Sequence, residues 1–204
     1  KNIHGAIQKV VAEVLADNQR IIFNGDNYTK EWHAEAEKRG IPNLRNTPDA
    51  LEVLAQPEVK ELFKHQGVYS EQELTSRRTV FLENYVKTVS IEASLSSHMA
   101  QTLILPAAFK FATSLTSTPG AGAKKVREQV EGLTDRLQDA IVRLDKARAE
   151  AESSHGDILA HARAYRDRIL PAMEQVREAA DLLEGIVDDA LWPLPKYREM
   201  LFVY

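Results

Sequence analysis

The stretch VREQVEGLTDRLQDAIVRLDKARAEA, residues 126–151, decides the fold of this chain. Its apolar residues recur at alternating spacings of four and three, at Val126, Val130, Leu133, Leu137, Ala140, Leu144, Ala147 and Ala151. This a/d heptad spacing is typical of a helix that packs along its whole length against other helices. The pattern predicts a long helix in a bundle with coiled-coil-like packing.

Two further long helices are predicted on either side of this stretch. One begins at Ser70 and Glu73, which match a capping box, and meets no stop signal until residues 116–122. The other follows a turn at residues 153–156 and continues the apolar series with Ala162, Tyr165, Ile169, Met173, Val176, Ala180, Leu183, Val187 and Ala190. Pro106 and Pro171 should kink these helices without ending them. Because short connections make neighbouring helices antiparallel, residues 70–191 are predicted to run up, down and up.

Shorter elements are predicted before and after the bundle. A helix over residues 2–19 carries an apolar stripe that must pack against something: Ile3, Ile7, Val10, Val11, Val14 and Leu15. Residues 20–28 read as an extended segment entering a tight turn, followed by a helix over 29–39 that Gly40 closes. Two short helices should start at Pro48 and Pro57, and the tail 192–204 should dock back.

The predicted fold class is therefore all-α: an elongated up-down-up helical bundle preceded by short helices and turns. We expect residues 1–69 to hold the end of one helix plus connecting short helices, 70–191 the three-helix bundle, and 192–204 the tail. The chain begins without Met and apparently inside a helix, which suggests a piece of a larger protein.

Composition limits the classes of function. The 204 residues include 26 Lys and Arg against 30 Asp and Glu, with both signs interleaved, so no broad basic face for nucleic acid is expected. The chain has no cysteine, which excludes disulfides and thiol chemistry and fits a cytoplasmic protein. No signal peptide is expected. Residues 93–109 lack charged side chains but are too short and too polar to span a membrane, so they should form a buried helix in water.

No catalytic, cofactor-binding or metal-binding residue is predicted. The candidate metal ligands are six scattered histidines without the clustering that zinc requires: His4, His33, His65, His98, His155 and His161. His98 is the most interesting, and a histidine hydrogen-bonded inside a helix interface is the preferred interpretation over a functional one. The turn at residues 24–28 has a weak anion-site signal, but ordinary turn chemistry is preferred.

Charged residues near the bundle are interpreted as solvated surface. The carboxylate pairs Glu31 with Glu35 and Glu128 with Glu131 each share a helix face, but neither lies in an apolar setting that would shift a pKa. Arginines gather near the second turn of the bundle, at positions 136, 143, 148, 163, 166 and 168, and neighbouring aspartates and glutamates offset them.

Several strings resemble the region after the catalytic core in type III glutamine synthetases. They are IFNGDNY at 22–28, EWH at 31–33, EA at 35–36, KRG at 38–40, NLR at 43–45, TPDAL at 47–51, ENYVK at 83–87, IEA at 91–93, ILPA at 104–107 and PKYREMLF at 195–202. The agreement is ordered and densest before Phe111. Asn27 stands where the family usually has Gly, and because Asn is the next best residue for a left-handed turn position, we expect the turn to form. Residues 94–99 also depart from the family's pattern.

The resemblance implies a non-catalytic C-terminal helical domain, serving assembly or regulation, of an enzyme that makes glutamine from glutamate and ammonia. That parent enzyme would use ATP and Mg or Mn, belong to the cytoplasm and form a ring-based homo-oligomer. The expected partners are the rest of the synthetase chain and neighbouring subunits, with no nucleic acid and no membrane. The fragment alone is expected to be inactive. The alternative is a free-standing helical protein–protein interaction module that binds through residues 3–15 or 93–109.

Overall fold

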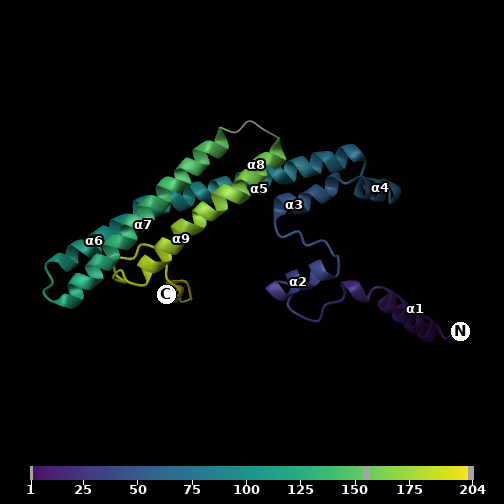
Figure 1. The fold of residues 1–204 in the computed structure, drawn as a ribbon, viewed down its shortest axis with the longest axis horizontal. Coiled ribbons are helices and arrows are strands. Elements are labelled where there is room, and N and C mark those ends of the chain that lie inside the picture. The colour runs from purple at the N-terminus through teal and green to yellow at the C-terminus, as the bar shows by residue number, and fades with distance from the viewer. Residues whose placement is uncertain (1, 154–156, 202–204) are drawn as a thin grey trace. The chain divides into compact units, whose positions relative to one another are not determined.

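The computed structural model describes residues 2–153 and 157–201, and within these ranges every regular element is a helix (Figure 1). The all-α prediction is confirmed. Contacts divide the chain into two compact units, Lys1–Arg45 and Asn46–Tyr204. The short helices after Asn46 therefore belong to the same unit as the bundle, and the predicted division at residues 69 and 191 stays a prediction.

The first unit contains two α-helices. Helix α1, Ile3–Asp17, begins at Asn2, whose side-chain oxygen accepts a hydrogen bond of 3.2 Å from the Gly5 backbone. Helix α2, Lys30–Lys38, ends where Gly40 takes a left-handed φ of 63°, as predicted.

The segment between these helices differs from the prediction at its start. Gln19–Ile21 is a 3-10 helix, η1, rather than extended chain, because Ile21 and Ile22 donate to the carbonyls three residues before them. The expected turn is present, but it forms without a left-handed Asn27, since within the described ranges only glycines have positive φ. The turn forms instead around Asp26, whose side chain accepts a 2.9 Å hydrogen bond from the Tyr28 backbone.

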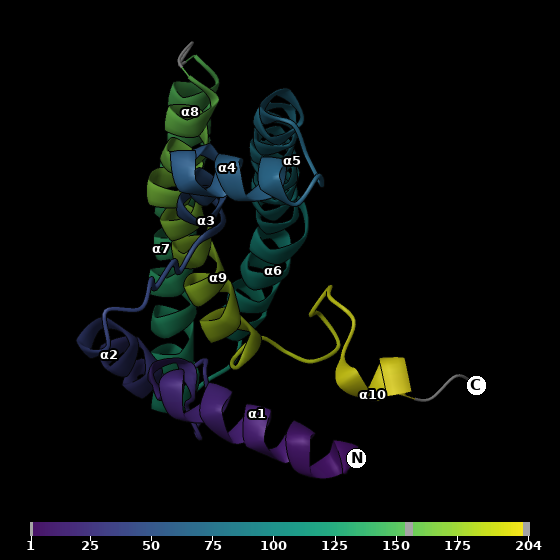
Figure 2. The same ribbon diagram turned by 90° about the vertical axis from the view of Figure 1, so that its right-hand side faces the viewer.

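The second unit starts with short helices. These are α3, Thr47–Leu51, continued by the 3-10 helix η2, Glu52–Ala55, and then α4, Pro57–His65. Both α3 and α4 have proline in the first turn, where a backbone N–H has no acceptor within the helix, so its absence costs no hydrogen bond. Helix α3 packs on α5 and α8 (Figure 2).

The first long helix runs from α5, Glu71–Met99, through the π-helix η3, Ala100–Ile104, into α6, Leu105–Thr116. Ser70 and Glu73 form the predicted capping box. Pro106 has no N–H to donate, and the π-helix just before it lets Leu105 donate to the Ala100 carbonyl five residues earlier. The helix thus continues through the proline, as predicted.

The remaining long helices are α7, Ala121–Glu152, and the run α8, Ile158–Ala164, π-helix η4, Tyr165–Ile169, and α9, Leu170–Glu184. Pro171 again follows a π-helix. Helix α7 packs against both α6 and α9, which confirms the antiparallel arrangement (Figure 1). The predicted turn residues 154–156 lie outside the described residues.

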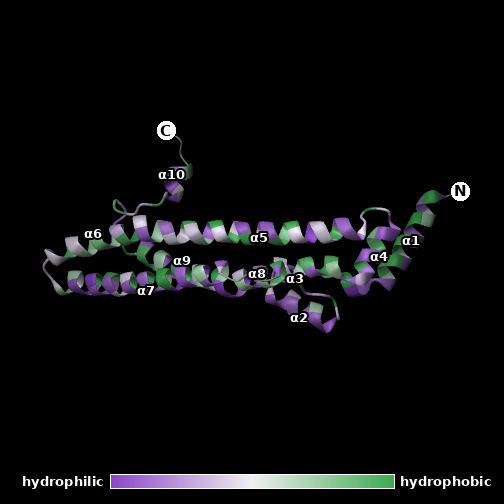
Figure 3. Ribbon diagram, turned by 90° about the horizontal axis from the view of Figure 1, so that it is seen from above, coloured by the Kyte–Doolittle hydropathy of each residue, from purple (hydrophilic) through white to green (hydrophobic). Residues whose placement is uncertain are grey.

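The core of this unit is the predicted heptad seam. Every seam residue of α7 is buried or half-buried, and hydrophobic and hydrophilic residues alternate around the long helices (Figure 3). The second series is buried or half-buried as far as Val187, which lies beyond the end of α9 at Glu184, whereas Ala190 is exposed. Trp192, in the tail, joins the core, and the tail then forms the short helix α10, Tyr197–Leu201. None of the described helices is long and apolar enough to cross a membrane.

Candidate functional site

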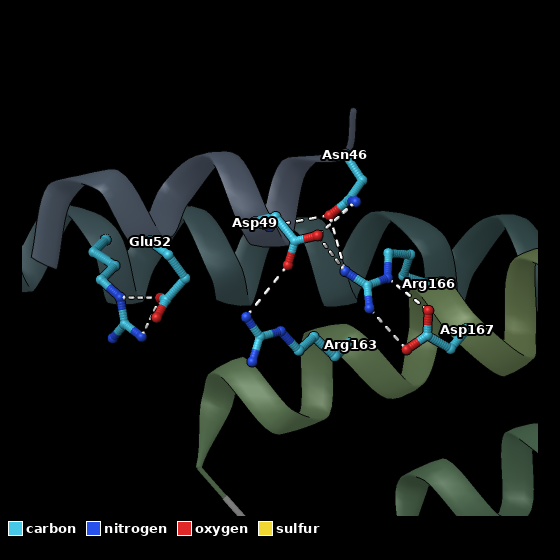
Figure 4. Close-up of polar contacts among 7 residues, drawn as sticks. Asn46, Asp49, Glu52, Arg163, Arg166 and Asp167 are labelled. Atoms are coloured by element: carbon cyan, nitrogen blue, oxygen red, sulfur yellow. Dashed lines mark hydrogen bonds and ion pairs between the residues drawn. The ribbon is translucent and has the colours of Figure 1, made fainter. Parts of the chain in front are cut away.

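The densest polar cluster ties α3 to α8 and η4 (Figure 4). Asp49 accepts two hydrogen bonds from arginines: Arg166 Nη1 donates to Oδ2 at 2.7 Å, and Arg163 Nη2 donates to Oδ1 at 3.3 Å. Arg166 also holds Asp167 through two hydrogen bonds, from Nε at 2.6 Å and from Nη2 at 2.9 Å. Asn46, the N-cap of α3, accepts from the Asp49 backbone at 3.0 Å and from Arg166 at 3.2 Å. We call these five residues the arginine–carboxylate cluster.

Hydrogen bonds within this cluster stabilise the charged form of its carboxylates. The Asn46 side chain, followed by Arg166 and Arg163, holds the pKa of Asp49 below its usual value. A hydrogen bond from Arg166 lowers the pKa of Asp167 in the same way. Both carboxylates are thus fixed in their ionised form, whereas a general acid at neutral pH needs a raised pKa. The cluster is built to hold α3 in place, and a second pair, Arg78 Nε to Glu52 Oε1 at 2.7 Å, fastens η2 to α5.

A second polar contact crosses between α5 and α7. The Ser97 hydroxyl is buried and donates to Asp145 Oδ1 at 2.7 Å, while Gln101 Nε2 donates to Ser97 at 2.9 Å and to Asp145 Oδ2 at 3.1 Å. Arg148 adds an ion pair to Asp145 at 3.3 Å. His98, predicted inside a helix interface, is instead exposed beside this contact, because neighbouring Ser97 occupies the inward face. That part of the prediction is wrong.

The predicted carboxylate pairs are surface groups. A hydrogen bond from Arg39 lowers the pKa of Glu35, and hydrogen bonds from its own backbone N–H and from Thr29 lower the pKa of Glu31. Glu31 thus places a carboxylate in the first turn of α2, just after the turn at residues 24–28. On α7, Glu128 pairs with Lys124 at 3.8 Å and Glu131 with Arg127 at 3.4 Å.

The histidines remain scattered. His33 Nδ1 lies 3.0 Å from the side-chain amide of Asn43, and the ring of His161 packs edge-on against Tyr165 with centroids 5.1 Å apart. His155 lies outside the described residues. Within the ranges that the structure covers, no three or more His, Asp or Glu side chains gather to hold a metal ion. The divalent metal implied for the parent enzyme therefore finds no fitting donor set here, and no step of catalysis is assigned to these residues.

Sequence reasoning missed the role of Asp49 in the cluster. It placed Arg163 and Arg166 in a surface group offset by nearby acids, but their partner lies 114 and 117 positions away, respectively. The only local signal was the Asn46-x-x-Asp49 spacing at a helix start, which predicts capping and says nothing of a distant arginine.

The fold and these contacts define an all-α domain whose short helices are held to the long helices by ion pairs. A family model described as "Glutamine synthetase C-terminal domain" matches residues 6–121, more than half of the chain, and the chain belongs to this family. The match extends from α1 to the first residue of α7.

Full-length relatives agree with this assignment. The chain is 31% identical over 216 residues to the type-3 glutamine synthetase of Dictyostelium discoideum, covering 97% of this chain and 29% of the relative. It is 28% identical over 212 residues to a glutamine synthetase of Bacteroides fragilis (strain YCH46), with the same coverage. A glutamine synthetase of Butyrivibrio fibrisolvens is 29% identical over 210 residues, covering 96% of this chain and 29% of the relative. The chain thus spans less than a third of these relatives, and the predicted resemblance is confirmed.

Proposed function

We propose that this chain is a non-catalytic part of a type-3 glutamine synthetase and that it serves to assemble that enzyme. The parent would join ammonia to glutamate, with ATP and Mg or Mn held by residues outside this chain, as a cytoplasmic homo-oligomer. Family membership and the three glutamine synthetase relatives support the enzyme assignment.

The observation that carries the assembly role is the uncovered face of α1. The predicted apolar stripe is present on this helix, and its six side chains are between 48% and 66% exposed: Ile3, Ile7, Val10, Val11, Val14 and Leu15. No residue of α1 is buried within its own unit. A continuous apolar face of this kind on an ordered helix is typical of a surface that another protein segment covers. The natural cover is the remainder of the synthetase, which the relatives possess.

The test compares two substitutions on opposite faces of α1 in the full-length protein. Val10→Asp places a charge in the stripe, and Ala12→Asp places the same charge on the opposite, exposed face. An unpaired buried carboxylate costs several kcal/mol, so Val10→Asp should weaken assembly more than about tenfold, measured by sedimentation and by glutamine formation. Ala12→Asp should leave both near the wild-type values.

Two results would contradict the proposal. Equal behaviour of the two variants would mean that nothing covers the stripe. Glutamine formation by this chain alone, supplied with ATP, glutamate and ammonia, would mean that the domain is catalytic.

A further inference from the structure

The bundle contains the same local structure twice. Each π-helix is 5 residues long and ends at the isoleucine of Ile-Leu-Pro-Ala, and the leucine that follows donates to the carbonyl of the first π residue. The backbone angles also agree, since Ile104 and Ile169 both have φ −73° and ψ −51°. The runs α5–η3–α6 and α8–η4–α9 can therefore be compared residue by residue, with Ala100 matching Tyr165.

The two runs share their inward face. With the first residues of the π-helices matched, the same positions are buried in both runs: Ser97 and Ala162, Ala100 and Tyr165, Ile104 and Ile169, and Ala107 and Ala172. Both runs also pack on α7. Their other neighbours differ, because Leu105 is buried whereas Leu170 is 37% exposed. The repeat thus concerns the backbone and the buried face, and the element that each run holds on its other side can differ.

The second residue of each π-helix reaches a neighbouring helix. In η3, Gln101 Nε2 donates to Asp145 Oδ2 of α7 at 3.1 Å. In η4, Arg166 Nη1 donates to Asp49 Oδ2 of α3 at 2.7 Å (Figure 4). The first and last residues of each π-helix are buried, so they hold the turn against the core while the second residue lies toward the outside. Matched positions in the two runs therefore make the same kind of contact with different partners.

We infer that η3 and η4 are two copies of one positioning device. Each adds one residue to a turn of a long helix, because its hydrogen bonds span five residues instead of the four of an α-helix. The wider turn lets the helix continue through a proline and sets the second π residue against an aspartate of a neighbouring helix. Single π-turns of this kind within α-helices frequently mark functional positions.

The device at η4 anchors the chain where it enters the bundle. Asn46 is the first residue of the second unit and the N-cap of α3, and its side chain accepts from Arg166 at 3.2 Å. Asp49, the charged acceptor, has a side chain that is only 32% exposed. A hydrogen bond between charged groups is stronger than one between neutral groups. Arg166 thus controls how firmly α3 is held, and this inference does not depend on the proposed function.

Hydrogen exchange of the α3 and η2 backbone amides in this chain tests the contact. Arg166→Ala should speed their exchange by at least about tenfold, because α3 opens more often without its charged partner. The core amides of α7 should exchange as in the wild type. Arg166→Gln gives η4 the residue that η3 has at the matched position, and it should retain most of the protection. Arg168→Ala, at an exposed position of the same π-helix, is the matched control and should change nothing.

A deletion tests the π-helix itself. Removing Arg168 together with Pro171→Ala takes out the extra residue and restores α-helical spacing, so α8 and α9 should keep their buried faces and unfold cooperatively in urea. Helix α3 should nevertheless lose its protection, as in Arg166→Ala. Removing Asp139, an exposed residue inside the regular helix α7, rotates part of the buried seam by about 100° and should abolish the cooperative transition.

Three results would overturn the inference. Unchanged exchange of α3 in Arg166→Ala would mean that Arg166 does not hold this helix. Equal loss of protection in Arg166→Gln and Arg166→Ala would mean that the matched positions of the two π-helices are not equivalent. Unfolding of the Arg168 deletion, like that of the Asp139 deletion, would mean that the π-turn is not a removable insertion.

Discussion

Leu137→Ala tests the packing on which the bundle depends. Leu137 lies on α7 with no exposed surface, in the core shared by the long helices. Truncating a fully buried leucine to alanine costs about 3–5 kcal/mol, because transfer free energy is lost and a cavity remains. Leu182, on α9, is the matched control, since it is the same residue type in the same bundle but 47% exposed. Leu182→Ala should cost about 1 kcal/mol or less.

Urea unfolding of the chain, followed by far-ultraviolet circular dichroism, measures both variants. With a slope of about 2 kcal/mol per molar urea, the midpoint should fall by about 2 M for Leu137→Ala and by less than about 0.5 M for Leu182→Ala. Leu137→Asp goes further, because it adds an unpaired buried charge and approaches the whole stability of a domain, about 5–15 kcal/mol. It should abolish the cooperative transition.

Equal midpoints for Leu137→Ala and Leu182→Ala would refute the reasoning. Such a result would mean that Leu137 does not face the core, and the heptad register derived from residues 126–151 would be wrong. A change in slope without a change in midpoint would point to an altered unfolded state instead of lost packing.

Two further predictions concern backbone and charge. Gly132, inside α7, would meet no atom within 4 Å of an added Cβ, so Gly132→Ala should raise the free energy of unfolding by up to about 1 kcal/mol. Gly67 has a φ of 65°, so Gly67→Ala should lower the free energy of unfolding by about 1 kcal/mol. Urea unfolding measures both variants, and a change of the same sign in the two would contradict these predictions. The folded-state pKa of Asp49 lies below its usual 3.8, so its contribution to stability is present above that pH and lost as the pH falls through the lowered value. Asp49→Asn should lower the melting temperature at neutral pH and flatten its decline in acid, and an unchanged acid decline would contradict the assignment.

Periodicity predicted the parts of the fold that depend on burial. Leu137 and Leu144 are buried because heptad spacing keeps one face of α7 on its neighbours. The π-helices were not predicted, although each ends at the isoleucine of the same sequence, Ile-Leu-Pro-Ala. A proline removes one hydrogen-bond donor, and whether the helix bends or widens to accommodate it depends on the packing of the neighbouring helices, which local sequence does not contain.

The end of α9 and the arginine–carboxylate cluster show the same limit. Val187 continues the apolar period beyond the helix, because a turn after Glu184 still points it into the core. Arg166 meets Asp49 only because α3 packs on α8, and no short-range pattern relates residues 117 positions apart. The helix caps and the charged residues could be predicted from local sequence, whereas the partner of each charged residue depends on tertiary packing.

The two units differ in how far their apolar side chains are buried, and this difference supports the proposed role. In the second unit, buried leucines, isoleucines and alanines from all the long helices form one core. Among described residues of the first unit, Ala36 is the only fully buried apolar side chain, while α1 and Tyr28 remain exposed. A unit of this size without a core has too little buried apolar surface to offset its conformational entropy. We therefore expect contacts beyond the unit itself to order it, and the stripe of α1 is the apolar surface available for them.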